Sequence, residues 1–288
     1  MSSSSNARLQ ALRKNHARWD ELVPIHVSSE FYGLSRFRQG SVALCPIELE
    51  ELGDIKGRHL LHLLCHFGLG TLSLSRLGSI PTGVDYSEAA IQQARQLATE
   101  TRLPAEFVCS DVYDLPAVLK RTFDIVFASY GVLIWLDDLD RFAKTVAHFL
   151  APGGFFYLVD EHPFALVCRG EGVVENLRFA YPYFDESEPV RFQVPGSYAD
   201  RSAQLTNTEV FSWIHSLSNV VNSLIRAGLR IEFLHEFPFS VYQMFPGMTR
   251  GDDGRWTLPG PQSLPFLFSI KASKPAQSVP TDQGKQQD

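Results

Sequence analysis

Cysteine is scarce in this chain, and long apolar runs are missing. The 288 residues include only four cysteines, and no two of them form a C-x-x-C pair. Scattered cysteines in a chain of this length are typical of reduced thiols, so we expect no disulfides. No apolar run approaches the length of a membrane span, and Met1-Ser2-Ser3-Ser4-Ser5 lacks the basic and apolar parts of a signal peptide. We therefore expect a cytoplasmic protein.

A long basic run is also absent. The net charge is −6, and charged residues make up 20% of the chain against 44% hydrophobic residues. A mildly acidic chain of this kind is a poor nucleic-acid binder by charge alone. The composition favours a small-molecule ligand, with no nucleic-acid or membrane partner, and leaves the oligomeric state open.

The stretch that organises the rest of the chain is Leu60–Gly70, with the sequence Leu-Leu-His-Leu-Leu-Cys-His-Phe-Gly-Leu-Gly. Its first five residues predict a buried parallel strand, and its glycines predict a tight turn. A helix should follow over 71–78, which points backbone N–H groups at a ligand. Asp85 follows Gly68 by 17 residues, close to the spacing at which an acid on the second strand of a Rossmann-like unit binds a ribose. These features predict a nucleoside ligand.

Strand and helix patterns alternate after this stretch. Apolar runs predict further strands that end at Asp85 and over 106–109, 123–128 and 155–159, with helices over 88–99 and 139–149 between them. Such alternation predicts an α/β fold with a doubly wound parallel sheet, whose ligand lies at the carboxyl ends of the strands. A helix over 218–227 and strands over 229–235 and 265–272 should complete the sheet with an antiparallel pair.

Composition divides the chain into five segments. Leu9, Leu12, His16 and Trp19 recur at helical spacing, so residues 1–45 should form a helical cap. We expect the Rossmann-like core over 46–162 and its C-terminal part over 216–273. The long link over 163–215 predicts an inserted substrate lid, with strands at 190–194 and 208–213. Residues 274–288 have the composition of a disordered tail.

Five motifs, in order, resemble those of class I S-adenosylmethionine-dependent methyltransferases. They are Leu-Leu-Cys-His-Phe-Gly, Thr-Gly-Val-Asp-Tyr-Ser, Cys-Ser-Asp-Val, Phe-Asp-Ile-Val-Phe-Ala-Ser-Tyr-Gly and Phe-Leu-Ala-Pro-Gly-Gly, and they lie between Leu60 and His162. The resemblance implies a seven-stranded sheet, mostly parallel with an antiparallel last strand. It also implies S-adenosylmethionine as cofactor, S-adenosylhomocysteine as product, and methyl transfer to an O, N or C atom of a small molecule.

The resemblance further implies roles for single residues. The methionine part of the cofactor would lie against Cys65, His66, Phe67 and Gly68. The nucleoside part would meet Asp85 at the ribose, Tyr86 and Val112 beside the adenine, and Asp111 at the adenine amino group. Ser129 and Tyr130 would lie near the sulfonium and the acceptor.

The motif series departs from the family at its first turn. His62, Leu64 and His66 stand where the family has an acid and two glycines. A neutral imidazole is a weaker partner for the methionyl ammonium than a carboxylate. A catalytically silent S-adenosylmethionine-binding partner or sensor is therefore the first alternative. A nicotinamide-dependent oxidoreductase is the second, although Ser73 stands where its third glycine belongs.

Proton transfer would need a base if the acceptor is a hydroxyl. The nearest candidates are His162, which follows the fifth strand, and His215 at the lid exit, and Tyr130 could orient the acceptor. We expect no metal, because no ligand cluster accompanies His62, Cys65 and His66. The sequence does not name the acceptor.

Overall fold

The computed structural model describes residues 3–170, 177–184, 188–260 and 263–276, and its centre is a seven-stranded sheet. The strand order is β10-β13-β5-β4-β1-β2-β3. In chain order the bounds are β1 His59–Leu63, β2 Ile80–Asp85, β3 Glu106–Cys109, β4 Phe123–Ser129, β5 Leu150–Glu161, β10 Arg230–Phe237 and β13 Leu267–Ser273. Strands β3, β2, β1, β4 and β5 pair in parallel, while β13 runs antiparallel to both β5 and β10. The predicted fold class, with its antiparallel last strand, is confirmed.

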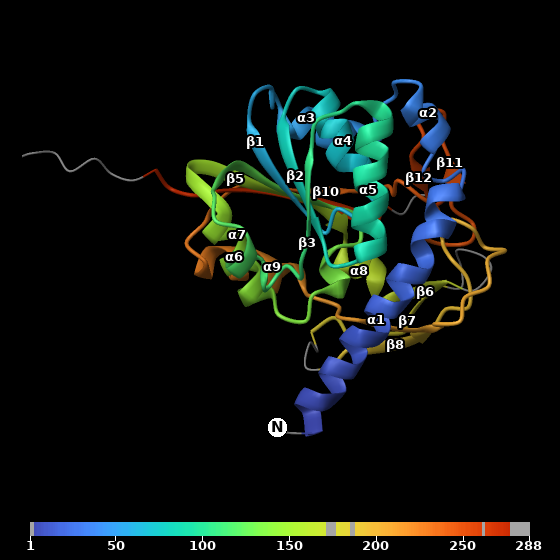
Figure 1. The fold of residues 1–288 in the computed structure, drawn as a ribbon. Helices are drawn as coiled ribbons and strands as arrows, with labels where there is room; N and C mark the ends of the chain where they lie inside the picture. The colour runs from blue at the N-terminus through green and yellow to red at the C-terminus, as the bar shows by residue number, and fades with distance from the viewer. Residues whose placement is uncertain (1–2, 171–176, 185–187, 261–262, 277–288) are drawn as a thin grey trace, which may run out of the picture.

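Helices cover both faces of this sheet (Figure 1). One face carries α3 Pro46–Leu52, α4 Leu69–Arg76 and α5 Glu88–Thr101, and the other carries α6 Leu115–Val118, α7 Leu139–Phe149 and α9 Leu217–Arg226. Successive residues of β1 serve opposite faces, because Leu60 packs with the α3 side and Leu61 with the α7 side. Central strands that are buried on both faces read as continuous apolar runs, which is why the sequence revealed them.

The helices begin at side-chain caps. The Ser87 hydroxyl accepts from the backbone N–H of Ala90 at the start of α5, and the Asp138 carboxylate accepts from that of Arg141 at the start of α7. Serine and aspartate are among the residues that most favour the N-cap position. The fifth strand is longer than predicted, because Leu150 already pairs with Phe123 of β4 before a register shift. Residues 150–154, which lie outside the strand predicted over 155–159, therefore belong to β5.

The lid segment contains the strands that were predicted for it. Strand β8 Val190–Gln193 pairs antiparallel with β9 Glu209–Ser212, and this hairpin lies against the long helix α1 Ser3–Ser28. Shorter elements complete the described chain, namely α2 Leu34–Arg38, η1 Leu133–Trp135, α8 Pro163–Leu166, β6 Cys168–Gly170, β7 Leu177–Phe179, β11 Thr249–Arg250 and β12 Trp256–Thr257.

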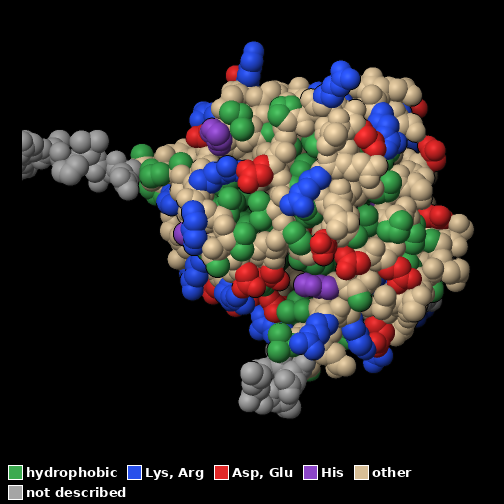
Figure 2. All heavy atoms as spheres, in the orientation of Figure 1, with side chains coloured by type: hydrophobic (Ala, Val, Ile, Leu, Met, Phe, Trp, Pro, Cys, Tyr) green, Lys and Arg blue, Asp and Glu red, His purple; other side chains and the backbone are tan. Residues whose placement is uncertain are grey.

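The remaining expectations concern the surface and the chain ends. On the face that Figure 2 shows, basic and acidic side chains are interspersed over the described residues. Among the helices described, none is both long enough and apolar enough to cross a membrane. All four cysteines are free thiols. Of the tail that was expected over 274–288, residues 277–288 lie outside the described part of the chain.

Candidate functional site

A pocket opens at the carboxyl ends of β1, β2 and β3. Its floor is apolar and includes Leu64, Val84 and Val112, its polar side holds Asp85 and Asp111, and its aromatic wall is formed by Tyr86, Tyr113 and Trp135. Helix α1 contributes Leu12 and His16 to the same pocket. Carboxyl ends of neighbouring parallel strands meet at one edge of the sheet, which is where α/β proteins bind ligands.

Asp85 is the buried acid of this pocket. One carboxylate oxygen accepts from the backbone N–H of His66 at 2.8 Å, and the other accepts from that of Ser87 at 2.9 Å. Burial raises the pKa of Asp85 to about 6, although these two N–H groups oppose the rise. Each oxygen keeps a lone pair for a further donor, so the carboxylate can bind a ligand hydroxyl and shape the first turn together.

Asp111 lies at the end of the next strand. Its Oδ1 accepts from the backbone N–H of Tyr113 at 2.8 Å, which closes a tight turn after β3. Val112 follows it on the pocket floor. Two acids at successive strand ends, separated by apolar floor, suit a ligand with a polar edge and a flat apolar body.

The first turn keeps a glycine-like backbone without its glycines. Leu64 and His66 have φ angles of 52° and 51°, in the left-handed region that non-glycine residues rarely adopt. Gly68 has φ 79°, and a Cβ there would lie 2.7 Å from the Phe107 ring and 2.8 Å from Ala94 Cβ. Leu64 and His66 are not glycines, but their backbone keeps the left-handed conformation that glycine adopts most easily.

His62 cannot supply the charge of the acid that the family has at this position. Its Nδ1 lies 2.9 Å from the Thr71 hydroxyl, which ties β1 to α4. Burial lowers the pKa of His62 to about 3, so the imidazole is neutral over the physiological range. The residue has a packing role between strand and helix.

A second polar cluster surrounds the carboxyl ends of β4 and β5. Its carboxylate is Glu161, whose Oε1 accepts from the Tyr242 hydroxyl. Burial raises the pKa of Glu161 to about 7, the neighbouring Asp160 adds to the rise, and the Tyr242 hydroxyl opposes it. The hydroxyls of Tyr32 and Tyr198 bond to each other beside this pair and join the N-terminal segment to the lid. The cluster can hold or take up a proton near neutral pH.

A histidine pair connects the lid to the first turn. His26 Nδ1 lies 2.9 Å from His66 Nε2, and His26 Nε2 lies 3.0 Å from the Ser197 hydroxyl. Burial lowers the pKa of His26 to about 4, and the nearby Arg18 adds to this effect. Both imidazoles are therefore neutral at pH 7, because burial also lowers the pKa of His66. Trp19 covers the pair edge-on, with ring centroids 5.8 and 5.1 Å away.

The comparisons with known proteins agree with this geometry. The family model of a methyltransferase domain matches residues 61–158. A ubiquinone biosynthesis O-methyltransferase of Coxiella burnetii is 33% identical over 116 residues, which cover 40% of this chain and 49% of the relative. The enzyme of the same name from Xanthomonas oryzae pv. oryzae is 26% identical over 213 residues, which cover 71% of this chain and 84% of the relative. Residues 61–158 of this chain therefore resemble a methyltransferase domain.

Solved methyltransferase structures share the fold. An S-adenosylmethionine-dependent methyltransferase from Mesorhizobium loti is 20% identical with a TM-score of 0.55, and the match covers 82% of this chain and 99% of that one. The DhpI–SAH complex structure is 18% identical with a TM-score of 0.53, and the match covers 93% and 98%. The Coxiella relatives are matched over about half of their length. The chain shares the fold of those structures.

The structure brings four of the predicted cofactor residues together. Asp85, Tyr86, Asp111 and Val112 all line the pocket, and the backbone N–H of His66 bonds to Asp85. Cys65 and Phe67 are buried in the core beneath the turn. Their side chains pack the turn onto α5, and Leu64 is the residue of the turn that lines the pocket.

Ser129 and Tyr130 lie at the end of β4, as predicted. The Tyr130 backbone N–H donates to the Val159 carbonyl at 2.8 Å, and its φ of 51° again marks a sharp turn. The Tyr130 phenol is buried near Glu48 of α3, and both burial and that carboxyl raise its pKa. Glu48 itself accepts from the backbone N–H of Cys45 at 2.7 Å.

His162 faces away from Glu161, its neighbour in the chain. Its Nδ1 accepts from the Phe164 N–H at 3.0 Å to begin α8, and its Nε2 lies 2.9 Å from Glu236 Oε1 on β10. Successive side chains at the end of a strand point to opposite faces, so only one of the two residues can reach the Tyr242 cluster. That residue is Glu161.

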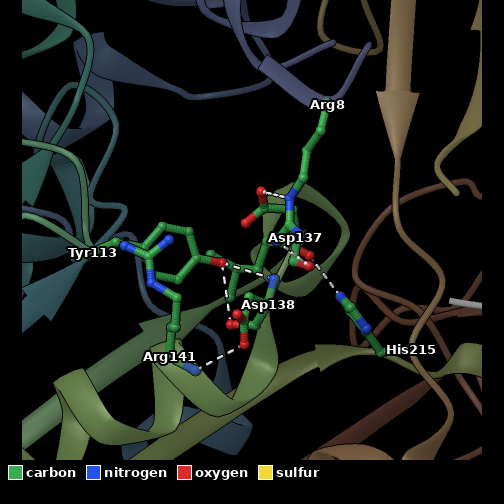
Figure 3. Close-up of polar contacts among 7 residues, drawn as sticks. Arg8, Tyr113, Asp137, Asp138, Arg141 and His215 are labelled. Atoms are coloured by element: carbon green, nitrogen blue, oxygen red, sulfur yellow. Dashed lines mark hydrogen bonds and ion pairs between the residues drawn. The ribbon is translucent and has the colours of Figure 1, made fainter. Parts of the chain in front are cut away.

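His215 supports the pocket wall from behind (Figure 3). Its Nε2 donates to the Leu136 carbonyl at 2.7 Å, in the loop that brings Trp135 and Leu136 to the pocket. The same loop is held by the Tyr113 hydroxyl, which accepts from the Asp138 N–H at 3.0 Å, and by Arg8 of α1, which bonds to Asp137. The structure thus places His215 under the loop.

Sequence reasoning missed the polar residues of the lid side. Glu161 bonds to Tyr242, Tyr198 to Tyr32 and Ser197 to His26, and each pair joins residues that are far apart in the sequence. Strand alternation was the one usable signal, since it separates Glu161 from His162. In the part of the chain that the structure describes, there is no group of three or more His, Cys, Asp or Glu side chains that could hold a metal ion.

Proposed function

We propose that this protein transfers a methyl group from S-adenosylmethionine to a small-molecule acceptor. The observation that carries the proposal is the pocket in which Asp85 and Asp111, at the ends of neighbouring strands, lie beside the apolar residues Leu64, Val84 and Val112. It lies within the residues that match the methyltransferase domain model. That match favours methyl transfer over the nicotinamide oxidoreductase alternative.

The residues fit the cofactor in their chemistry. Asp85 has free acceptor capacity for ribose hydroxyls, Tyr86 offers an aromatic ring to the base, and Asp111 offers an acceptor to an amino group. The left-handed turn at Leu64 and His66 gives the amino-acid end the close backbone approach that glycines give elsewhere. When bound, the cofactor supplies an electrophilic methyl carbon on a positively charged sulfur.

The chain's own part in the reaction is alignment, exclusion of water and removal of a proton. Leu12 and His16 of α1 line the pocket, so this helix would shield bound ligands from water, which favours in-line displacement. We propose Glu161 as the group that takes the acceptor proton, because it titrates near neutral pH and lies at the end of β5 beside Gly131. Its bond to Tyr242 would set its orientation.

The acceptor class follows from that base. A hydroxyl must lose a proton as it gains a methyl group, whereas a thiolate or a neutral amine attacks without prior deprotonation. The name O-methyltransferase of the Coxiella and Xanthomonas relatives agrees with an oxygen acceptor. We therefore propose a small-molecule hydroxyl. His162, His215 and Tyr130 as catalytic residues stay predictions.

The test starts with binding. Calorimetric titration with S-adenosylmethionine, S-adenosylhomocysteine and NAD should show binding of the first two only, and Asp85→Ala should weaken both. The wild-type protein is then assayed for label transfer from methyl-labelled S-adenosylmethionine to phenols, alcohols, amines and thiols. Binding without transfer to any acceptor would favour the silent sensor, and binding of NAD alone would favour the oxidoreductase.

A further inference from the structure

Helix α1 presents two polar faces to the rest of the molecule. Asn15, Arg18 and Glu21 face the lid hairpin and bond to its backbone. Leu12, His16 and Asp20 are spaced by four residues, so they share the other face of the helix. A helix with polar contacts on two sides is not a simple apolar cap, and Leu12 and His16 of the second face line the pocket.

His16 lies directly on the aromatic wall. Its imidazole is stacked on the Tyr86 ring with centroids 3.8 Å apart and planes 9° apart. Burial lowers the pKa of His16, although Asp111 and Asp20 oppose the effect. A neutral flat heterocycle thus lies in parallel contact with the ring that offers its face to a base.

Asp20 lies one helical turn further along, beside the acid of β2. Its Oδ1 accepts from the Ser87 hydroxyl at 2.5 Å, and the Ser87 N–H donates to Asp85 Oδ1 at 2.9 Å. Ser87 therefore joins two carboxylates that belong to different elements. The negative charge of Asp20 raises the pKa of Asp85, so hydroxyl donors between the two acids would relieve their repulsion.

We propose that α1 forms the second wall of the donor site, with His16 covering the base opposite Tyr86 and Asp20 accepting from a ribose hydroxyl. This inference rests on the proposed function, because it takes the donor to be an adenine nucleoside. A spacing of 3.8 Å leaves no room for a base between the rings, so they must separate by about 3.5 Å, one aromatic thickness, as it enters. The hairpin bonds of Asn15 and Arg18 make the lid move with the helix.

The test compares His16→Ala, His16→Phe and Asp20→Ala with Arg13→Ala, which alters an exposed residue of the same helix. S-adenosylhomocysteine is titrated by calorimetry, and adenosine and adenine are then titrated in competition with it. Stacking of a base on an aromatic side chain predicts about tenfold weaker binding of all three ligands to His16→Ala. His16→Phe should retain wild-type affinity, because it keeps a flat ring.

Asp20→Ala should weaken S-adenosylhomocysteine and adenosine about threefold to tenfold and leave adenine unchanged, because adenine has no ribose. Arg13→Ala should bind all three as the wild type does. Unchanged or tighter binding to His16→Ala overturns the inference, since an imidazole that merely occupied the Tyr86 face would compete with the base.

Thermal unfolding of each variant identifies losses that come from misfolding. A wild-type protein that fails to bind S-adenosylhomocysteine overturns the proposed function and this inference together. A wild-type protein that binds it while His16→Ala and Asp20→Ala remain indistinguishable from Arg13→Ala overturns this inference alone.

Discussion

The Asn15 side chain pairs with Phe211 as a neighbouring strand would. Asn15 Nδ2 donates to the Phe211 carbonyl at 2.7 Å, and the Phe211 N–H donates to Asn15 Oδ1 at 3.0 Å. The buried Asn15 amide thus satisfies both the backbone N–H and the backbone carbonyl of Phe211 in β9. The N-terminal helix and the lid, separated by most of the chain, are held in one unit by such bonds.

Replacing Asn15 by alanine should loosen this unit. The change leaves the Phe211 N–H and carbonyl without partners, and we expect the free energy of unfolding to fall by about 2 kcal/mol. Amide hydrogen exchange should become faster at Phe211 and its neighbours in β9. Arg13→Ala on the exposed face serves as control. Equal exchange in the two variants would show that the hairpin does not depend on α1.

Arg18 should not tolerate lysine. Its guanidinium donates to the carbonyls of Val194, Asn207 and Gly196 at 2.7 to 2.8 Å, and only 4% of the residue is exposed. Lysine is a point donor that cannot meet three carbonyls in one plane. We expect Arg18→Lys to cost about 2 kcal/mol by urea unfolding, since bonds to charged donors are strong. Arg13→Lys, matched in chemistry but exposed, should change stability by less than about 0.5 kcal/mol.

Local sequence patterns were enough to predict the sheet. Strands such as Phe123–Ser129 read as apolar runs because both faces are buried, and Ser87 and Asp138 read as N-caps because their side chains bond within one turn. The place of the pocket followed from the same logic, since Asp85 and Asp111 follow consecutive parallel strands; its nucleoside ligand stays a prediction. Interactions of this short range depend on residues that are close in the sequence, so they can be predicted from it.

The lid side could not be predicted in the same way. His26 meets Ser197 across 171 residues, and Tyr242 meets Glu161 across 81, through chain with no regular period. The backbone of the first turn was also hidden, because Leu64 and His66 adopt a glycine conformation without being glycine. Packing around the turn imposes that conformation, so the conformational preferences of the single residues do not predict it. The cytoplasmic location stays a prediction.

Gly68→Ala should disrupt the turn from beneath. A Cβ at this position meets the Phe107 ring at 2.7 Å and Ala94 at 2.8 Å, and the φ of 79° adds backbone strain. We expect a loss of about 2 to 4 kcal/mol in unfolding free energy, together with weaker binding of S-adenosylhomocysteine. Gly153→Ala is the matched control, because its φ is 80° while a Cβ there meets nothing within 4 Å. Equal losses in both variants would assign the whole effect to backbone strain.

The Glu161 carboxyl should make both stability and activity depend on pH. Its pKa is raised from the ordinary value of 4.5 for a glutamate to about 7 in the folded protein, so the folded state holds a proton between these values that the unfolded state has released. The stabilising effect is complete below about pH 4.5, falls as pH rises and is lost above about pH 7. Glu161→Gln removes this dependence, so the variant should gain stability relative to the wild type between pH 5 and pH 8. Urea unfolding at the two pH values measures the difference.

If Glu161 takes the acceptor proton, the rate of methyl transfer should rise with pH through about 7 in the wild type, because only the carboxylate form accepts a proton. Glu161→Gln should lower kcat by about a hundredfold or more and abolish this rise of the rate with pH, here called the pH limb. Its affinity for S-adenosylhomocysteine should be unchanged. Tyr242→Phe removes the hydroxyl that favours the carboxylate form, so its limb should move to higher pH. A limb that persists in Glu161→Gln would assign the proton to another group, and His162→Gln would then be the next variant to measure.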